Sequence, residues 1–492
     1  MIALSVLVPA GALGQTNDEI NAGLQFSFSS PGARSLAMGG AFSGLADDAT
    51  AAYANPAGLI WLSRSEVSLE GRYRSYKTRY PDIGNASGVP RGLGLDTRGD
   101  LLFSERSSQT EGLSFLSYVH HFKKRWRLAV YQHQLADFKA EISSRGPFIR
   151  STNASGQARS RLAGVQGSLE LEVRNTGLAT AFQATENFWI GFGISLYEFA
   201  FDATTRRYQT ILPRSGNGQA IFGPVELVEA NERDRHLQKG DDSDIAGHLG
   251  LIWKGKSNRW SLGLVYHQAP SFEFRYEFLW GQKAIANAIG DADGDGIIES
   301  FPNPDFVDPA IPRVLSGESS FEVPSVLSLG FKFQPTVVWT LSFEYTRVNY
   351  SSLEPENNIL YFGVENLNTC GDFSQNGTPQ NIECINSQDR LDRFVVDDAD
   401  EFHVGLEYVI RRPRQIALRL GAWLDPDHQM RFENPERIGP PEDRFEPRFR
   451  PGSDEIHLTG GFGWVVGDFQ FDFGVDLSDR AEIASLSTVY RF

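Results

Sequence analysis

The chain has 492 residues, a net charge of −16 and a pI near 5.1, and 12% of its residues are aromatic. Phosphate binding requires clustered Lys and Arg, so this balance excludes nucleic acid as an expected partner. The longest apolar runs fall short of the roughly 18 residues of a membrane-spanning helix, which argues against a helical membrane protein. The acidic charge fits either simple solubility or a barrel with acidic outer loops.

The N-terminal residues 1–14 read MIALSVLVPAGALG, an apolar run with small residues at Ala12 and Gly14. This pattern is typical of a secretory signal peptide cleaved before Gln15, although the usual basic n-region is missing. The alternative is a short buried strand. We expect a signal peptide over 1–14 and export into the bacterial envelope.

Residues 15–64 show no strand-like alternation. Asp48 and Thr50 favour capping of a short helix over 49–53, because their side-chain oxygens accept hydrogen bonds from free backbone N–H groups. Asn55-Pro56 then ends the helix. We predict that 15–64 forms a small helical hatch, or plug, in the lumen of a barrel.

From residue 65 onward the dominant signal is alternation with a period of two. The stretch Asp468–Leu477 reads DFQFDFGVDL, with large apolar residues on one face and charge or glycine on the other. A strand of a soluble sandwich also alternates, but this combination is typical of lipid-facing and lumen-facing positions in a membrane barrel. Fourteen segments share the pattern, at 66–79, 111–122, 125–138, 166–183, 187–205, 244–255, 259–276, 324–334, 337–349, 401–411, 414–424, 454–466, 468–479 and 481–492.

The connections between these segments alternate between short and long. Tight turns near 123–124, 185–186 and 256–258 alternate with long connections, as do those near 335–336, 412–413 and 467–468; only the last of the intervening connections, at 478–480, is short. Outer-membrane barrels have short periplasmic turns and long outer loops. We therefore predict an all-β fold, a 14-stranded antiparallel transmembrane β-barrel over 65–492.

One long connection carries a possible metal site. Asp291, Asp293 and Asp295, with Glu299 beyond a glycine, place carboxylates at the alternate positions of a calcium loop. The twelfth position is Pro302 instead of Glu, so the loop is not an EF-hand. We predict a structural Ca²⁺ in this outer loop; the alternative is an acidic, solvated loop. No cofactor is expected to be required.

The two cysteines, Cys370 and Cys384, lie in a polar segment with no histidine or further cysteine to complete a zinc site. A disulfide that restrains an outer loop in an oxidising compartment is the preferred interpretation. The alternative is a pair of unpaired thiols.

The last segment, AEIASLSTVYRF, alternates and ends in Phe492. A terminal aromatic residue on an alternating strand resembles the C-terminal assembly signal of outer-membrane proteins, which makes the barrel-assembly machinery an expected partner. The alternative is a soluble edge strand that ends in Phe.

Together, GARSLAMGGAF at 32–42, ADDATAAYANPAGL at 46–59 and the terminal Phe resemble the long-chain fatty-acid outer-membrane transporter (FadL) family. In that family an N-terminal hatch with an Asn-Pro-Ala motif plugs a fourteen-stranded barrel, and the motif matches Asn55, Pro56 and Ala57. The resemblance implies passive uptake of hydrophobic molecules such as fatty acids or hydrocarbons, with a gated lumen and lateral exit. It places the chain in the outer membrane beside lipopolysaccharide.

Two other functions were weighed. Relatives with the same N-terminal pattern assist protein secretion, so an anchor or shuttle role is the main alternative. An outer-membrane enzyme is a third, but no Gly-x-Ser-x-Gly, P-loop or HExxH motif occurs, and we expect no catalysis. Polar residues expected on the lumen face suit a charge-balanced network better than a metal or acid–base site: His248, His267, Lys332, Glu344, His403, Glu407, Arg419, Asp472 and Asp476.

Overall fold

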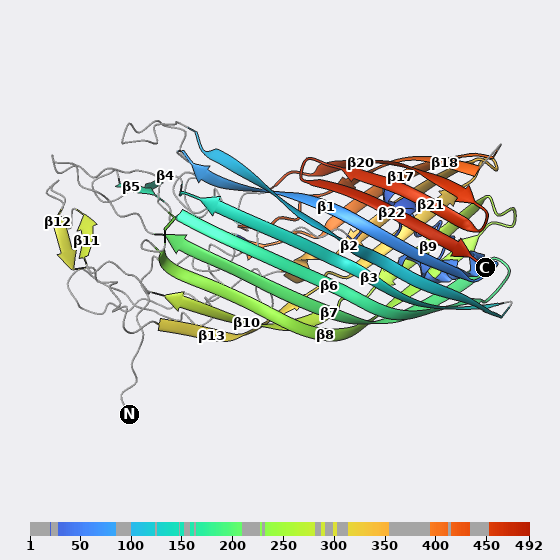
Figure 1. Cartoon of the computed structure of the whole chain (residues 1–492), viewed down its shortest axis with the longest axis horizontal. Coiled ribbons are helices and arrows are strands. Elements are labelled where there is room, and N and C mark those ends of the chain that lie inside the picture. The colour runs from blue at the N-terminus through green and yellow to red at the C-terminus, as the bar shows by residue number, and fades with distance from the viewer. Residues whose placement is uncertain are drawn as a thin grey trace, which may run out of the picture.

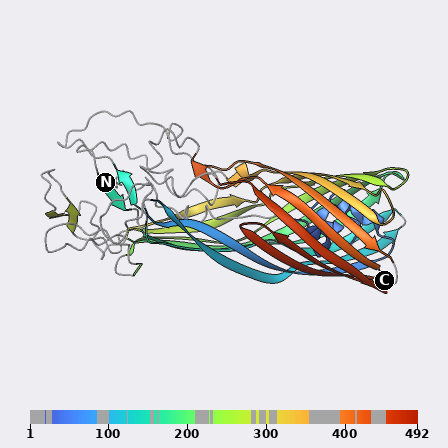
Figure 2. The same cartoon turned by 90° about the horizontal axis from the view of Figure 1, so that it is seen from above.

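The computed structural model places the chain in one elongated barrel, with the C-terminus at the end where the short turns gather (Figures 1 and 2). The structure describes Ile20 and residues 28–84, 100–123, 125–146, 148–151, 158–161, 164–208, 227–228, 232–280, 287–290, 299–302, 313–353, 394–411, 415–432 and 452–492. No helix among these residues is long and apolar enough to cross a membrane.

Fourteen antiparallel strands close the barrel, because the first strand pairs with the last and the chain of neighbours is unbroken. In their order around the wall they are β1 (Glu66–Ile83), β2 (Leu102–Lys123), β3 (Trp126–Ser144), β6 (Gly164–Gln183), β7 (Phe188–Tyr208), β8 (Glu232–Lys254), β9 (Trp260–His267), β14 (Val326–Phe333), β15 (Trp339–Val348), β17 (Ala399–Ile410), β18 (Gln415–Asp425), β20 (Glu455–Val466), β21 (Phe469–Leu477) and β22 (Ala481–Arg491).

The remaining elements lie before, above or beside this wall. They are α2 (Ala33–Ala37), α3 (Ala51–Ala54), the 3₁₀ helices η1 (Pro56–Trp61) and η3 (Tyr350–Leu353), and the strands β4 (Phe148–Ser151), β5 (Ala158–Arg161), β10 (Ser271–Trp280), β11 (Asn287–Gly290), β12 (Glu299–Pro302), β13 (Arg313–Glu322), β16 (Phe394–Val395) and β19 (Arg431–Phe432).

The barrel has a tall wall and a short wall. Strands β2, β6, β7 and β8 contain 20 to 23 residues, whereas β15, β17, β18, β20, β21 and β22 contain 9 to 12. A tilted strand of about 9–11 residues already crosses a bilayer. The tall wall, to which β10 and β13 add height beside β8, therefore rises well beyond the membrane (Figure 1).

An exposed apolar band surrounds the half of the barrel nearer the short turns, which we call the lower part, and every wall strand contributes to it. On β7 the outward residues Ile190, Phe192, Ile194 and Leu196 are 36–50% exposed, while their lumen-facing neighbours are buried. Leucines and aromatic residues continue the band through β14 and β21. So much exposed apolar surface on a closed wall is stable only against lipid.

The predicted strands agree closely with those observed, and the prediction of a 14-stranded barrel is confirmed. The segment expected at 187–205 is β7 (Phe188–Tyr208), and the segment expected at 414–424 is β18 (Gln415–Asp425). The single strand expected at 259–276 is wrong: the structure divides it into β9 and β10, because the strand is interrupted at 268–270, where Pro270 has no N–H to donate to a ladder. The upper half of β8 and the short hairpins above the wall were not predicted. Residues 1–14, Asp291, Asp293, Asp295, Cys370 and Cys384 lie outside the described residues, so the signal peptide, calcium loop and disulfide stay predictions.

Candidate functional site

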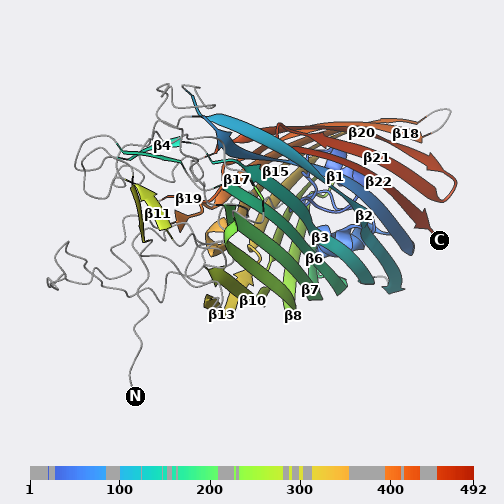
Figure 3. The same cartoon turned by 60° about the vertical axis from the view of Figure 1, so that its left-hand side comes forward.

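The first feature inside the barrel is the luminal segment, residues 28–62, whose short helices lie within the wall (Figure 3). Thr50 precedes α3 without capping it through its side chain; Asp48 instead accepts the Thr50 N–H at 2.9 Å. Asn55 ends α3, accepts the Ala57 N–H at 3.1 Å and donates to the Ser43 carbonyl at 2.8 Å. The Asn-Pro-Ala motif thus holds two turns of the segment together.

Strands from all around the wall hold the luminal segment by hydrogen bonds. Glu344 of β15 accepts the N–H groups of Phe42 and Ser43 at 2.8 and 2.7 Å and the Ser43 hydroxyl at 2.7 Å. Other wall side chains bond to backbone groups of the segment, namely Glu70, Ser117, Arg127, His248, Ser261, Ser342, His403, Thr459 and Ser487. Buried backbone groups are thereby satisfied without a regular helix.

Glycines on the lumen face let the segment approach the wall at backbone distance. A Cβ at Gly250 would lie 2.1 Å from Asn55 Oδ1, and one at Gly191 would lie 2.1 Å from the Ala57 nitrogen. The same close approach recurs at Gly263, Gly330, Gly405, Gly421 and Gly474. Because any side chain at these positions would collide with the segment, these glycines form a seat for it.

A buried ionic network anchors α2 to the short wall. Arg34 donates two hydrogen bonds to Glu407, at 2.9 and 3.0 Å, and Arg419 donates to the same carboxylate at 2.8 Å. Arg419 also donates to Asp472 at 2.7 Å. Each buried charge thus has an opposite charge beside it, as the charge-balanced interpretation of the lumen expected.

Above this network a polar stack lines the short wall. The Trp423 indole lies between the rings of His403 and His457, at centroid distances of 5.2 and 3.9 Å, and donates to Asp476 at 3.0 Å. A cavity of about 40 Å³ separates part of this stack from the luminal segment. A space of that size holds water but no organic molecule.

Tyr53 of the luminal segment lies among histidines of the wall. Its ring is 4.4 Å from that of His133 and 4.5 Å from that of His267, and His248 stacks on His267 at 5.2 Å. Within the described residues no group of three or more His, Cys, Asp or Glu side chains is arranged to hold a metal ion. The ring contacts of Tyr53 with His133 and His267 pack the luminal segment against the wall.

The alternation of the tall wall reverses partway along its strands. On β7 the large apolar residues face outward as far as Leu196, but from Tyr197 onward Phe199 and Phe201 face inward and Glu198 and Asp202 face outward. The same reversal occurs on β3 and β6, and β10 continues the inner surface; the buried apolar residues on this inner side are Phe138, Ile142, Leu169, Leu171, Val173, Phe272 and Phe274. We call this inner surface the apolar trough.

Aromatic contacts fill the trough across strands. Phe199 stacks on Phe272 at 4.8 Å although β8 lies between their strands. The contact is possible because Gly240 of β8 leaves the space between them free: a Cβ there would lie 2.7 Å from Phe199 and 2.6 Å from Phe274. Burial lowers the pKa of His236, on the same strand, to about 3, so its ring is neutral near pH 7.

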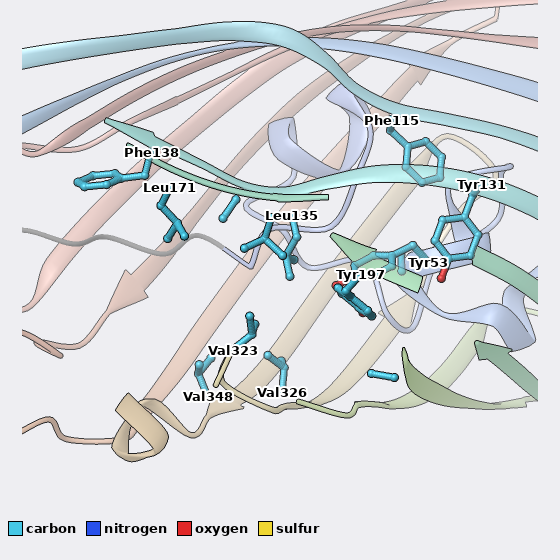
Figure 4. Packing of buried hydrophobic residues seen from close by; sticks show 14 of the residues in the cluster. Tyr53, Phe115, Tyr131, Leu135, Phe138, Leu171, Tyr197, Val323, Val326 and Val348 are labelled. Carbon is cyan, nitrogen blue, oxygen red and sulfur yellow. The ribbon is translucent and has the colours of Figure 1, made fainter. Parts of the chain in front are cut away.

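Figure 4 shows how the trough relates to the luminal segment. Phe138 and Leu171 lie together on one side of the interior, and Tyr53, Tyr131 and Tyr197 gather nearer the luminal segment. The trough therefore ends on an aromatic floor that the segment and the wall build together. Ile20 also lies against the trough, beside Ile142 and Gly167.

The ladder between β2 and β3 is broken beside the trough. The two strands pair only between Phe115↔His133 and Lys123↔Trp126, whereas β1–β2 and β3–β6 stay paired to their upper ends. A bulge between Gln134 and Ala136 turns β3 away at this point. Residues 105–107 and 111–113 of β2 are exposed on both faces. We call this gap in the hydrogen-bonded wall the wall break.

Side chains still cross the wall break. The Thr110 hydroxyl donates to the Asp137 carbonyl at 3.2 Å, and Arg106 pairs with Glu141 at 2.6 Å. At the top, the Ser144 hydroxyl donates to the Pro81 carbonyl at 2.6 Å, so β3 leans directly on β1. Side chains therefore span the wall break, which ends at the Ser144–Pro81 contact on one side and at the paired part of the β2–β3 ladder on the other.

The predicted motif residues Asn55, Pro56 and Ala57 lie together against the wall. Glu299 begins β12, where its backbone pairs with Gly290, and it is not part of the luminal site. Sequence reasoning missed the trough and the wall break. The trough had a visible signal, since the apolar residues of β7 change from even positions such as Phe192 to odd positions such as Phe199. The lack of apolar alternation over 102–113 was the corresponding signal for the break.

A closed antiparallel barrel with a lipid-facing apolar band defines an outer-membrane β-barrel of Gram-negative bacteria, and its fold is that of the FadL-type transporters. The chain is similar to a FadL homologue of Pseudomonas aeruginosa, with 14% identity, a TM-score of 0.57, and coverage of 95% of this chain and 100% of that one. It is also similar to the TodX deltaS2S3 mutant monoaromatic hydrocarbon channel, with 15% identity, a TM-score of 0.54 and coverage of 95% and 100%.

A third similar structure is the CymD monoaromatic hydrocarbon channel, with 14% identity, a TM-score of 0.52, and coverage of 95% of this chain and 99% of that one. At these identities the likeness establishes the fold. No protein-family model and no curated protein sequence matches the chain.

Proposed function

We propose that this barrel is a passive channel for hydrophobic molecules, which enter the apolar trough from outside and leave sideways through the wall break. The observation that carries the proposal is the trough itself, an apolar inner surface that rises above the membrane and ends beside the wall break. These residues form a buried apolar core for the tall wall. The same apolar surface would bind hydrophobic cargo.

The trough supplies the driving force for capture. Transfer of apolar surface out of water is favourable by roughly 25 cal/mol per Å², and ring-on-ring contacts add to this. Phe199 and Phe272 are fully buried and stack on each other, so an apolar molecule would bind by taking the place of this ring contact. Uncharged hydrocarbons and the chains of fatty acids both suit such a surface.

The route out is lateral because the axial route is blocked. The luminal segment acts as the plug, held by hydrogen bonds from the wall and seated on glycines such as Gly250. A cargo molecule that reaches the aromatic floor would lie beside the wall break, whereas the luminal segment would block its way to the periplasm. The channels similar in fold are named for hydrophobic cargo, which supports the same assignment.

The first experiment is mass spectrometry of organic extracts from the purified, folded barrel, followed by titration with toluene and with oleate. We expect a bound apolar ligand, displaced by one of the two. Phe199→Ser and Phe272→Ser should each weaken binding by about 1–2 kcal/mol, roughly 5- to 30-fold.

Ala200→Ser is the matched control, because residue 200 faces outward one position from Phe199. Its affinity should equal that of the wild type. No bound apolar ligand, together with equal affinities in all variants, would contradict the channel and return the secretion-anchor alternative to first place.

A further inference from the structure

The short turns at the end opposite the loops carry an uneven distribution of charge. Four of them contain no Asp or Glu. One is the β2–β3 turn, which reads KKR at 123–125; the other three are consecutive around the barrel and read GKSNR at 255–259, QPTVV at 334–338 and RRPR at 411–414. The flanking turns contain Glu186 and Asp468 instead. In a chain whose net charge is −16, five basic residues in three turns without an acidic one are a marked local excess.

These three turns are consecutive around the barrel and touch one another. The Gln334 N–H donates to the Arg259 carbonyl at 2.6 Å, which joins the β8–β9 turn to the β14–β15 turn. Arg411 donates to the Val337 carbonyl at 2.6 Å, which joins the latter to the β17–β18 turn. Lys256, Arg259 and Arg411 are all exposed, and we call these three side chains the basic patch.

Lipid-facing aromatic pairs lie on the strands directly next to the basic patch. Trp253 and Trp260, on β8 and β9, pack edge to face at 5.4 Å, and Trp253 is 54% exposed. Trp339 and Tyr408, on β15 and β17, pack at 4.5 Å. Indole and phenol rings prefer the depth of the lipid headgroups, so they mark the level of the membrane surface at these turns.

We propose that the basic patch binds the phosphate headgroups of anionic phospholipids in the periplasmic leaflet of the outer membrane. Short turns of a bacterial barrel face the periplasm. Side chains one to three residues beyond the aromatic pairs reach headgroup phosphates without leaving the surface. Guanidinium and ammonium groups bind phosphate oxygens by charge-assisted hydrogen bonds.

A lipid suits the basic patch better than an acidic protein does. The turns are short and lie flush with the aromatic level, so they offer no raised or hollow surface for a globular partner. The patch also continues directly into the lipid-facing surface through Trp253 and Trp339, which a phospholipid would contact with its chains while its headgroup contacts Arg259 or Arg411.

The test is native mass spectrometry of the full barrel titrated with dioleoyl-phosphatidylglycerol and, separately, with dioleoyl-phosphatidylcholine. The wild type should prefer phosphatidylglycerol. The triple variant Lys256→Gln, Arg259→Gln, Arg411→Gln should lose the preference, with an effect of roughly fivefold per removed charge. Single variants give graded losses and keep the test available if the triple variant does not fold. Thermal protection by phosphatidylglycerol vesicles should follow the same order and fall in high salt.

The matched control is Lys139→Gln, Lys239→Gln, Arg275→Gln, which removes the same charge from exposed positions on the outer face of the tall wall. Its lipid preference should equal that of the wild type. The proposal is overturned if the patch variant keeps the full preference, if the control loses as much, or if the patch variant loses only a co-purifying periplasmic protein. Cargo binding at Phe199 is independent of all these outcomes.

Discussion

At the glycines of the lumen face, the absence of a Cβ atom decides how closely the luminal segment can approach the wall. In a barrel without a plug, a residue such as Gly250 could carry any polar side chain into a water-filled lumen. Here a Cβ would lie 2.1 Å from Asn55 Oδ1, so only hydrogen fits. The segment therefore replaces the side chains that would otherwise fill the lumen.

Gly250→Val tests this seat directly. The new Cβ would lie 2.1 Å from Asn55 Oδ1, so either the luminal segment moves away or the barrel does not fold. We expect ion conductance in planar bilayers to rise well above that of the wild type in whatever fraction folds. Gly247 lies on the same strand, β8, and its Cβ would have its nearest neighbour, the Gly193 carbonyl oxygen of β7, at an ordinary 3.5 Å, so Gly247→Val should conduct no more than the wild type. A folded, non-conducting Gly250→Val barrel would show that the segment does not need the seat.

Asn55 supports the segment from within, and substitutions can separate its two roles. Asn55→Ala leaves the Ala57 N–H and the Ser43 carbonyl without their bonds, at a cost of about 1–3 kcal/mol. Asn55→Asp keeps the acceptor for Ala57 but cannot donate to Ser43 unless protonated. Protease protection of the segment should fall in the order wild type, Asp, Ala. Equal protection in all three would mean that the motif has no role in holding the segment.

At the scale of elements, a titratable contact joins η3 to the residues that follow β18. His428 stacks on Tyr350 at 4.0 Å and lies 3.4 Å from Asp425. Burial by itself lowers the pKa of His428, but Asp425, the Pro426 carbonyl and Glu401 together raise the pKa above its usual value.

This shift predicts a pH dependence of stability. Because the folded pKa lies above the unfolded value of about 6.5, the contact stabilises fully below that pH and is lost as pH rises through the folded pKa. We expect the melting temperature of the wild type to fall more between pH 6 and pH 9 than that of His428→Gln. Parallel melting curves for the two proteins over this range would argue against a charged His428 in the fold.

The wall break is the element on which the proposed exit depends, and it can be closed chemically. In a background with Cys370→Ser and Cys384→Ser, Thr110→Cys and Asp137→Cys place thiols on both sides of the break, where the Thr110 hydroxyl now donates to the Asp137 backbone carbonyl at 3.2 Å. A short bifunctional crosslinker should reduce uptake of toluene by cells at least tenfold.

The control pair is Tyr118→Cys and Val130→Cys, which face each other across the intact part of the same β2–β3 ladder. Crosslinking there should leave uptake unchanged, because those strands are already joined by hydrogen bonds. Undiminished uptake after closure of the break would place the exit elsewhere.

Strand positions were predictable because apolar and polar residues alternate over about ten residues, so one or two atypical residues do not hide the pattern, as at 414–424. The luminal position of Arg419 and Trp423 followed from the same register. The wall break did not follow, because one bulge residue near Leu135 shifts the whole inner face of β3 without changing its composition. The ionic network around Glu407 was out of reach as well, since its partner Arg34 lies 373 residues away in the sequence.

At the scale of the whole molecule, the barrel is two structures joined along the same strands. The lower part is polar inside and apolar outside, as a membrane requires. The upper part of the tall wall is apolar inside and charged outside, as a soluble protein requires. The change on β7 falls between Leu196 and Glu198, so this point marks the outer surface of the membrane.

Labelling of cysteines along β7 in intact cells tests this boundary and the orientation of the barrel together. Ile194 and Ala200 both face outward on β7, with residues 196 and 198 as the outward positions between them. Each is replaced by Cys in a background without Cys370 and Cys384. A membrane-impermeant maleimide should label residue 200, which lies beyond the apolar band between Glu198 and Asp202, and should spare residue 194 until detergent is added.

Tyr197→Cys, which faces inward, should be labelled less once oleate or toluene fills the trough. If residue 194 is labelled as fast as residue 200, the apolar face of β7 is not in lipid; if neither is labelled, the tall wall does not face the medium, and capture from outside by the trough would lose its physical basis.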